Sequence, residues 1–440
     1  MNEFNSKILF NYLPSNMSST FNKRPQICVS IKQKGVLISI SKAVLFIDDV
    51  EIIPIIKKDI ISYTPSLDMP YGKHYIKVSI WDTNRNIYEY SWFFWIENNT
   101  SQYNFYYGVP HAHTSYSDGN NTPTEAYEYA RDNGIDFLIV TDHLGKLIKS
   151  NINNDEKILY EGKLYPKWEM LKIEEDAINK KYTNFLALIG FEANIENFGH
   201  MNIINSSSIP NKRKMTVEEF YTWLCIQEDI LIVAINHPKL PSEELPYSSK
   251  IDAFVNLIEV GNGSPPHKYR RSEEAYFKTL DDGWHIGAIN GQDNHTDNWG
   301  IPNNLTVIIA DKLNIDSVIS ALNLRRVYST ETRTLKLTVQ ANGYWMGSII
   351  DLKENEILNF KITAEDAVNP ISKIQIISNG GNILQEKLFD NAIKVEWDLL
   401  LPVKIESSWY VVKVFHSNEL ISLSSPVFVQ AIPNIYENIL

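Results

Sequence analysis

The middle of the sequence, residues 104–333, alternates between signals for α-helices and signals for buried β-strands, and this alternation constrains the fold more than any other feature. The run Thr122-Pro123-Thr124-Glu125 has the residues of a capped helix start, because its threonine can accept free backbone N–H groups and proline is tolerated in a first turn. The apolar run 135–140 then predicts a buried strand. A second capped start at 216–219 precedes another apolar strand at 230–235. Such repetition predicts an α/β fold with a parallel sheet, either open or closed into a barrel.

On either side of this region, short apolar runs are separated by turn signals. Alternation with a period of two and frequent turns predicts a β-sandwich in each flank. We therefore expect three domains: an N-terminal sandwich at 1–103, a central α/β domain at 104–333 and a C-terminal sandwich at 334–440.

Three local segments carry further expectations. The run 61–74 resembles bacterial immunoglobulin-like domains, so we expect the flanking sandwiches to be of that kind. The polar segment 145–176 predicts a loop with a helix that overhangs the site. The sequence Asn-Gly-Gly-Asn at 379–382 is typical of a hairpin turn.

Composition and charge exclude several classes of function. The formal net charge is -12 and no dense stretch of lysine or arginine occurs, which argues against a nucleic-acid scaffold. Cys28 and Cys225 fall in different predicted domains, so we expect two free, buried thiols in a reducing compartment. Residues 1–21 lack the pattern of a secretory signal, and no apolar run approaches the roughly 20 residues that span a bilayer. We expect a cytoplasmic protein without a membrane partner.

Histidine is concentrated in the middle of the chain. Of the ten histidines, only His74 and His416 lie outside residues 104–333. In barrels of alternating strands and helices, active sites lie where the C-terminal ends of the strands converge. The residues at or just after such predicted ends are His111, His113, Asp118, His143, Glu192, His200, His237, Asp293 and His295.

These residues invite a metal-binding interpretation, although simpler ones exist. His111 and His113 are two apart on an expected strand, so both can point to one face and reach one ion. A single histidine at a strand end is more often solvated or hydrogen-bonded, and we interpret His267 and His285 in that way. Asp142 is expected to orient a neighbour rather than to bind a metal. Jointly, the strand-end residues are hard to explain as solvated surface, and their mixture of imidazole and carboxylate suits Zn²⁺, Mn²⁺ or Fe²⁺.

The same motifs resemble those of the PHP family, named for polymerase and histidinol phosphatase domains, over roughly half of the chain. One departure is Gln292, where related sequences often have serine. The flanking β domains and the Asp-Asn-His ending look most like the carbaryl-hydrolase-like (CehA/McbA) branch. The matching pieces are His111-Ala112-His113-Thr114, Ser117-Asp118-Gly119, Thr141-Asp142-His143, Gly190-Phe191-Glu192, Asn236-His237-Pro238 and Asp293-Asn294-His295.

The resemblance implies a distorted barrel of about seven β-α units that holds two or three divalent ions of manganese, iron or zinc. Glu192, Asp293 and His237 would be the catalytic residues, with Glu192 bridging two ions and His200 as the least secure ligand because its spacing from the glutamate varies. The implied ligand sets are His111, His113, Glu192 and Asp293 for one ion, Glu192, His200 and His237 for a second, and Asp118, His143 and His295 for a third.

The leading hypothesis for function is hydrolysis of a phosphate monoester or small diester by an activated bridging hydroxide. Hydrolysis of a carbamate or carboxylic ester is the alternative that the branch raises, and a non-catalytic metal-containing binding protein is an alternative from another class. The partner would be a small-molecule ester, and self-association through the β domains stays open. Candidate substrate contacts, each of which could equally be a plain surface charge, are Lys239, Arg270, Arg325, Arg326 and Arg333.

Overall fold

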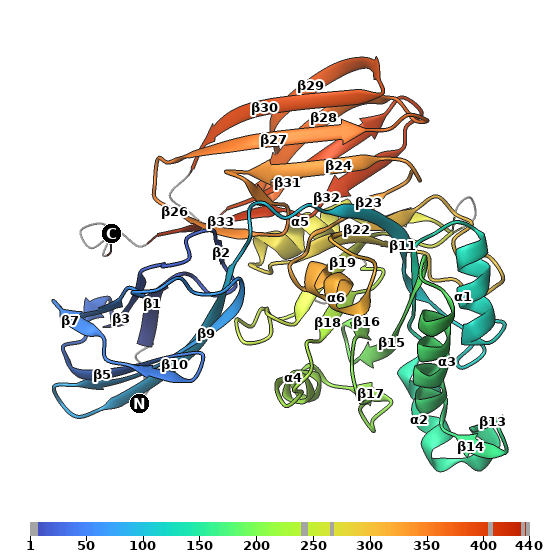
Figure 1. Ribbon diagram of the computed structural model, residues 1–440, viewed down its shortest axis with the longest axis horizontal. Helices are drawn as coiled ribbons and strands as arrows, with labels where there is room; N and C mark the ends of the chain where they lie inside the picture. Colours follow the sequence, from blue (N-terminus) through green and yellow to red (C-terminus); the bar gives the residue numbers. More distant parts are fainter. Residues whose placement is uncertain (1–7, 239–244, 265–267, 404–407, 433–435, 437–440) are drawn as a thin grey trace.

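The computed structural model describes residues 8–238, 245–264, 268–403, 408–432 and 436. Its architecture is mixed α/β and dominated by β-sheet (Figure 1). An N-terminal group of strands is followed by a central group in which strands and helices alternate, and then by a C-terminal group of strands. No described helix combines the length and the apolar character needed to cross a membrane.

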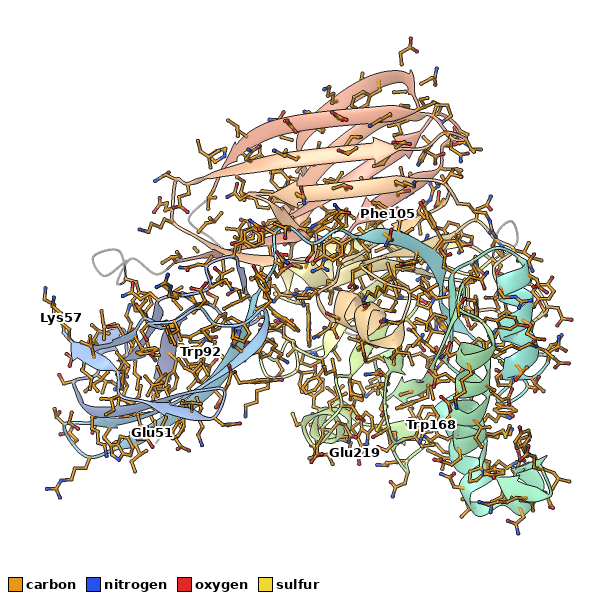
Figure 2. The ribbon with its side chains drawn as sticks, in the orientation of Figure 1. Glu51, Lys57, Trp92, Phe105, Trp168 and Glu219 are labelled. Carbon is orange, nitrogen blue, oxygen red and sulfur yellow. The ribbon has the colours of Figure 1, made fainter. Side chains whose placement is uncertain are left out.

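In the N-terminal region, the described strands form a pair of five-stranded sheets around one apolar core. Period-two alternation explains the packing: along β9, Ile76 and Val78 are buried, whereas Tyr75 and Lys77 are exposed. Figure 2 shows Trp92 inside this region and Glu51 and Lys57 at its periphery. One sheet contains β1 (Ile8–Leu13), β3 (Ile27–Gln33), β4 (Val36–Leu37), β7 (Ile55–Lys57) and β8 (Ile60–Tyr63), and the other contains β2 (Ser19–Thr20), β5 (Ile40–Ile47), β6 (Val50–Ile52), β9 (Gly72–Asp82) and β10 (Ile87–Ile96).

The central region alternates between strands and helices. Its strands are β11 (Asn104–Ala112), β12 (Phe137–Val140), β13 (Ile158–Tyr160), β14 (Lys163–Tyr165), β15 (Leu186–Ile195), β16 (Gly199–Ile204), β17 (Lys214–Met215), β18 (Ile232–Ile235), β19 (Val255–Asn262), β20 (Arg270–Arg271), β21 (Gly287–Gly291), β22 (Leu305–Ala310) and β23 (Val327–Thr330). Its α-helices are α1 (Pro123–Asp132), α2 (Leu144–Ile152), α3 (Lys167–Lys181), α4 (Val217–Cys225), α5 (Glu273–Asp281) and α6 (Ile315–Asn323).

Both predicted helix starts are confirmed. Thr122 caps α1 and Thr216 caps α4, and each helix has the complete capping box, in which the third residue after the cap returns a side-chain carboxylate to it. The strands that follow, β12 and β18, are buried along their whole length. The starts of α1 and α4 are therefore determined by hydrogen bonds between nearby residues rather than by tertiary contacts.

The central strands run around a ring of backbone pairings that begins and ends at β11. β11 pairs with β12 and β12 with β15, all parallel, whereas β16 pairs antiparallel with both β15 and β18. β18, β19 and β21 are again parallel. Just beyond β21, the N–H of Asp293 donates to the carbonyl of His111, and Ala112 and Asn294 form an isolated bridge. The antiparallel hairpin of β15 and β16 departs from the strict β-α alternation that the sequence predicts.

Two local expectations are confirmed only in part. Segment 145–176, predicted to be a loop with a helix, contains two helical stretches, most of α2 and the first part of α3, with the β13–β14 hairpin between them. Apolar residues such as Leu147 and Leu171 lie on the buried side of each helix, so the polarity of the segment reflects the exposed sides of its helices. Cys28 is buried as expected, but Cys225 is exposed, and both thiols are free.

In the C-terminal region, a four-stranded sheet packs against further strands across a second apolar core that includes Leu337, Phe360 and Val412. The predicted turn at 379–382 connects β28 to β29, with Gly380 and Gly381 at positive φ. The strands are β24 (Lys336–Ala341), β25 (Tyr344–Trp345), β26 (Ile349–Leu352), β27 (Ile357–Glu365), β28 (Ile371–Ser378), β29 (Asn382–Ala392), β30 (Lys394–Pro402), β31 (Ser408–His416), β32 (Ile421–Ser424) and β33 (Val427–Ala431).

The central and C-terminal regions share backbone hydrogen bonds. β23 pairs antiparallel with β22 on one side and with β32 on the other. Phe105, labelled in Figure 2, packs at this junction against the C-terminal core. The pairing of β23 with β32 therefore continues one sheet across the boundary predicted at residue 333.

Candidate metal centre

His111 and His113 lie at the end of β11 and are fully buried. Their Nε2 atoms are 3.2 Å apart. The spacing of two residues on a strand explains this, since alternate side chains share one face. Two imidazole nitrogens that face each other so closely are well placed to be ligands of one cation.

Glu192 lies at the centre of the histidines, within β15 rather than at its predicted end. Its side chain is 1% exposed, and in the described part of the chain its Oε2 atom meets no hydrogen-bond donor with suitable geometry. Burial acts to raise the pKa of this carboxyl, but the imidazoles of His143 and His200 outweigh it and hold the pKa well below its ordinary value. The distances from a carboxylate oxygen to a ring nitrogen are 2.7 Å for His143, 3.2 Å for His200, 3.4 Å for His111 and for His237, and 3.6 Å for His113.

Asp293 faces the same pair of buried histidines from the segment after β21, which runs parallel to the end of β11. Its Oδ1 atom is 3.5 Å from Nε2 of His111 and 3.2 Å from Nε2 of His113. Asp293 has φ +52° and His237 has φ +30°, conformations that cost an L-residue about 1–3 kcal/mol. The backbone thus holds both of these predicted catalytic residues in strained positions that aim their side chains at Glu192 and its neighbours.

A third group surrounds the outer side of His113. Asp118 lies 3.5 Å from Nε2 of His143 and 3.4 Å from Nε2 of His295. The ring of His113 lies between them, with centroid distances of 4.5 Å to His143 and 4.4 Å to His295. Asp118 is 47% exposed and His295 is 39% exposed, so this side of the cluster opens to solvent.

The distances within these groups fit coordination of divalent ions. Ligand atoms about 2.1 Å from a tetrahedral zinc ion lie roughly 3.4 Å from one another. Nitrogen and oxygen atoms that could hold a metal lie within 4.8 Å of one another in three sets: His111, His113 and Glu192; Glu192, His200 and His237; and His113, Asp118, His143 and His295. The structure thus brings all of the predicted ligands together, with Asp293 beside the first set.

Glu259 contacts His111 and His237 on the side away from the cluster, and the sequence analysis did not predict this role. It is fully buried in β19, and its Oε1 atom is 2.7 Å from Nδ1 of His111. Its Oε2 atom accepts hydrogen bonds from the backbone N–H of His237 and from the amide of Asn262. A carboxylate on the far nitrogen of a histidine fixes the tautomer and leaves the other nitrogen free for a metal. The available signal was a lone carboxylate inside the apolar run of residues 255–260.

Two polar side chains steady other members of the cluster. Asn236 donates a hydrogen bond of 2.8 Å to Oε1 of Glu192. Asp142 accepts hydrogen bonds from the backbone N–H and hydroxyl of Thr114, at 2.8 and 2.5 Å, and from the hydroxyl of Ser117. Asp142 therefore fastens the loop after His113 to the loop before His143.

Electrostatics differ between the two buried histidines. Burial acts to lower the pKa of His111, but the negative charges of Glu259 and Asp293 raise it to about 10. At His113 burial prevails and lowers the pKa, since the hydrogen bond that the ring can donate to Asp293 does not compensate for it. In the absence of a metal, His111 therefore carries the proton and the positive charge that hold its carboxylate neighbours together.

The predicted substrate contacts at Arg325 and Arg326 are wrong. Arg325 is buried and donates to the carbonyl of Gly347, and Arg326 forms a buried ion pair of 3.1 Å with Glu97. The carbonyl of Arg326 accepts a hydrogen bond from the N–H of Ile309, which is paired with Phe105 on β11. Phe105 is about 20 Å along β11 from His111. Both guanidinium groups thus join parts of the fold at the end of the strands that lies away from His111.

Of the remaining predictions, Arg270 stays close to the site because it donates to the carbonyl of Pro238, next to His237. Arg333 instead donates to backbone carbonyls such as that of Ile301. His285 lies outside the metal sets and pairs with Asp252 at 2.7 Å. Lys239 and His267 lie outside the described residues.

Comparisons with known proteins do not show a family for this chain. No protein-family model matches it, and no curated protein does. Among solved structures, it is similar to a two-domain protein from Bacteroides vulgatus that contains a predicted PHP-like metal-dependent phosphoesterase, with 14% identity, a TM-score of 0.42, and 75% of this chain and 99% of that chain covered. It is also similar to PsfC from Pseudomonas syringae, with 14% identity, a TM-score of 0.32, and 50% and 87% covered. Likeness at this level does not decide fold or function.

Proposed function

We propose that this protein is a metal-dependent hydrolase that cleaves phosphate esters, either monoesters or small diesters. The observation that carries the proposal is the position of Glu192, a buried carboxylate that five imidazoles approach within 3.6 Å. Imidazoles that crowd around one buried carboxylate in this way are expected where they share a cation. The motifs at these positions resemble the PHP family, and a distorted seven-unit barrel with immunoglobulin-like flanks is the architecture that we propose with it.

The three sets of residues offer nitrogen and oxygen donors of the kind that manganese, iron and zinc accept. His111, His113 and Asp293 would hold one ion, His200 and His237 a second, with Glu192 shared, and Asp118, His143 and His295 would hold a third. Such ions, when bound, supply an acidified water as nucleophile and positive charge for the oxygens of the ester.

The residues of the chain itself contribute orientation and access. Glu259 keeps Nε2 of His111 directed into the cluster, and Asn236 fixes the carboxylate of Glu192. The side-chain amide of Asn194 is hydrogen-bonded to Nε2 of His200 at 3.1 Å, and Nδ1 of that ring faces Glu192 at 3.2 Å. The half-exposed side at Asp118 and His295 is where an ester can reach these groups from solvent.

Two other functions are distinguishable from this one. Hydrolysis of a carbamate or carboxylic ester would use the same residues, and a non-catalytic metal-containing protein would bind ions without turnover. We propose a small-molecule substrate and a cytoplasmic location. Self-association through the β regions can be measured by light scattering.

The test is to load the purified chain with manganese, iron or zinc and to measure both bound metal and turnover. We expect more than one ion per chain and hydrolysis of phosphate monoesters or diesters. Faster turnover of carbamates or aryl acetates would favour the alternative chemistry. A reconstituted chain that binds no transition metal would overturn the proposal.

A further inference from the structure

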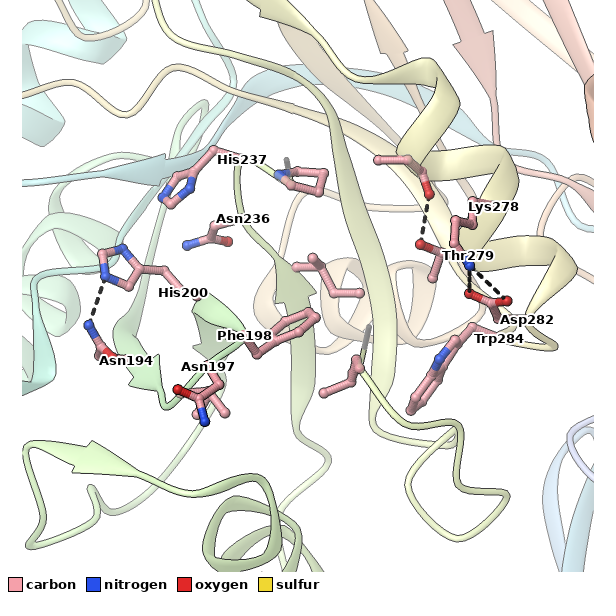
Figure 3. A pocket seen from close by; sticks show the side chains of 16 residues that line it. Asn194, Asn197, Phe198, His200, Asn236, His237, Lys278, Thr279, Asp282 and Trp284 are labelled. Carbon is pink, nitrogen blue, oxygen red and sulfur yellow. Dashed lines mark hydrogen bonds and ion pairs between the residues drawn. The ribbon is translucent and has the colours of Figure 1, made fainter. Parts of the chain in front are cut away.

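A cavity of about 460 Å³ opens beside His200 and His237. In Figure 3, His200, His237 and Asn194 lie at one side of it, Lys278, Asp282 and Trp284 lie at the other, and Phe198 lies between them. The hairpin of β15 and β16, the end of β18 and one side of α5 provide the walls. The cavity therefore begins at the candidate metal centre and leads away from it towards α5.

The lining of this cavity is mainly apolar. Ile195, Ile235 and Trp284 contribute buried hydrocarbon surface, and Phe198 and Leu245 extend it. Such surfaces favour a ligand group that leaves water, by about 25 cal/mol for each Å² of apolar surface covered.

Beyond the histidines, the charged side chains of the described lining are Lys278 on α5 and Asp282 just after it, which form an ion pair of 3.1 Å. Asn194, Asn236 and Thr279 also line the cavity, and each already has a hydrogen-bond partner in the protein. A ligand group with charges or many hydroxyls would therefore give up water for few free partners here, which is costly. The cavity is also large enough for an aromatic group, since pockets for small molecules start at about 300 Å³.

We propose that this cavity binds the alcohol part of the substrate and that this part is an uncharged aromatic or similarly bulky apolar group. The inference rests on the proposed phosphoesterase function and narrows its substrate class. In the reaction, a water oxygen forms a bond to phosphorus, the bond from phosphorus to the ester oxygen breaks, and a proton from the water ends on the released alcohol. The products are inorganic phosphate and the apolar alcohol, which leaves through the cavity.

The first test compares benzyl phosphate with ethyl phosphate on the metal-loaded enzyme. Both release alkyl alcohols of similar acidity, so their ratio of kcat/KM reports binding of the ring rather than leaving-group reactivity. We expect benzyl phosphate to be preferred about 50-fold, as contacts of a few apolar groups allow. A ratio near one, or a preference for glycerol phosphate over benzyl phosphate, would overturn the proposal.

The second test substitutes residues that line the cavity. Phe198→Ser should lower the ratio of benzyl to ethyl phosphate about tenfold, whereas Phe277→Ser, which removes a half-buried phenylalanine on α5 that stacks on Trp409 instead, should leave it within twofold. Thr279 lines the cavity, and among the described residues its hydroxyl bonds only to the carbonyl of Ala275 in its own helix. Thr279→Arg should therefore fold, disfavour benzyl phosphate, and raise the relative kcat/KM for 4-carboxybenzyl phosphate at least tenfold.

These measurements separate the two proposals. If the metal-loaded enzyme hydrolyses no phosphate ester, the proposed function fails, and the cavity is then tested by saturation-transfer NMR with benzyl alcohol as the probe. Signal transfer to benzyl alcohol that is lost in Phe198→Ser and Thr279→Arg supports the cavity as an apolar site. Equal transfer in all variants, or none in the wild type, overturns it, as does hydrolysis whose benzyl-to-ethyl ratio no variant changes.

Discussion

Buried histidines have different partners at their ring nitrogens in the N-terminal β region and in the central region. In the β region, His74 has an unlike partner on each side: Asp48 at Nδ1, 2.7 Å away, and the carbonyl of Pro70 at Nε2, 2.9 Å away. In the central region, Nδ1 of His111 has such a partner in Glu259, whereas its Nε2 lies 3.2 Å from Nε2 of His113, with carboxylate oxygens of Glu192 and Asp293 at 3.4 and 3.5 Å. Each ring nitrogen of His74 thus faces an oxygen acceptor at hydrogen-bonding distance, whereas the nearest polar atom to Nε2 of His111 belongs to another imidazole.

This contrast shows where the chain departs from the rules that stabilise a fold. The β regions match local propensity, alternation and polar pairing, whereas the central site gathers like groups and strained backbone at Asp293 and His237. Such departures are expected where function requires them and the surrounding structure compensates.

Glu192→Gln should abolish turnover and reduce bound metal. The carboxylate carries the charge that two sets of histidines share, and even residues behind metal ligands affect metal affinity roughly 10–100-fold, so we expect a loss of at least a hundredfold. Metal content, thermal midpoint and turnover on the best phosphate ester measure this. His285→Ala, which removes a histidine paired with Asp252 outside the sets, is the matched control. Wild-type metal content with a tenth or more of wild-type turnover in Glu192→Gln would contradict the role of this residue.

Glu259→Gln should weaken metal binding roughly 10–100-fold, because the far nitrogen of His111 would lose the anion that fixes its tautomer. Competition with a chromophoric chelator measures the affinity directly. Asp48→Asn makes the same change beside His74 in the β region and should leave metal affinity unchanged. Equal effects of the two substitutions would show that Glu259 acts only through general stability.

The metal-free protein should lose stability as the pH rises from 6.5 to 10. The pKa of His111 is raised from 6.5 to about 10 by folding, so its contribution is complete below pH 6.5 and is lost as the pH rises through 10. The pKa of Glu192 is lowered, so its contribution is present above its ordinary value of 4.5 and is lost only as the pH falls through its lower folded value. Thermal midpoints of metal-free and metal-loaded protein across this range provide the check. A midpoint that rises with pH in the metal-free protein would contradict the charge assigned to His111.

The smallest effect should come from Thr216→Ala at the cap of α4, which removes the hydroxyl that accepts the N–H of Glu219. Loss of such a cap costs about 1 kcal/mol of folding free energy. Denaturant unfolding should show this loss, while kcat/KM on a phosphate ester stays within twofold. A larger effect on turnover than on stability would mean that α4 takes part in the site.

The sequence predicts the parts of this molecule that depend on local chemistry. The caps at Thr122 and Thr216 place two helices, and the apolar runs place β12 and β18, because the deciding interactions lie within a few residues. The candidate ligands can also be predicted from the sequence, because His, Asp and Glu are unusual at the ends of apolar strands.

What could not be predicted depends on packing between distant segments. Glu259 was overlooked because its partner, His111, is 148 residues away, and only the ring of strands brings them together. Arg325 and Arg326 follow the last central helix, where a cation could be a ligand contact or a structural one. Their burial against Gly347 and Glu97, which lie in other regions of the chain, decides for the structural role.

The pairing of β23 with β32 has a consequence for how this chain can be divided. A fragment that ends near residue 333 would expose β23 as an edge, with unpaired N–H and C=O groups along its buried residues Val327–Thr330. Exposed edges of this kind are templates for association between chains and lead to aggregation. Truncation at this point is therefore disfavoured, because the C-terminal strands cover the edge at which the central sheet would otherwise pair with another chain.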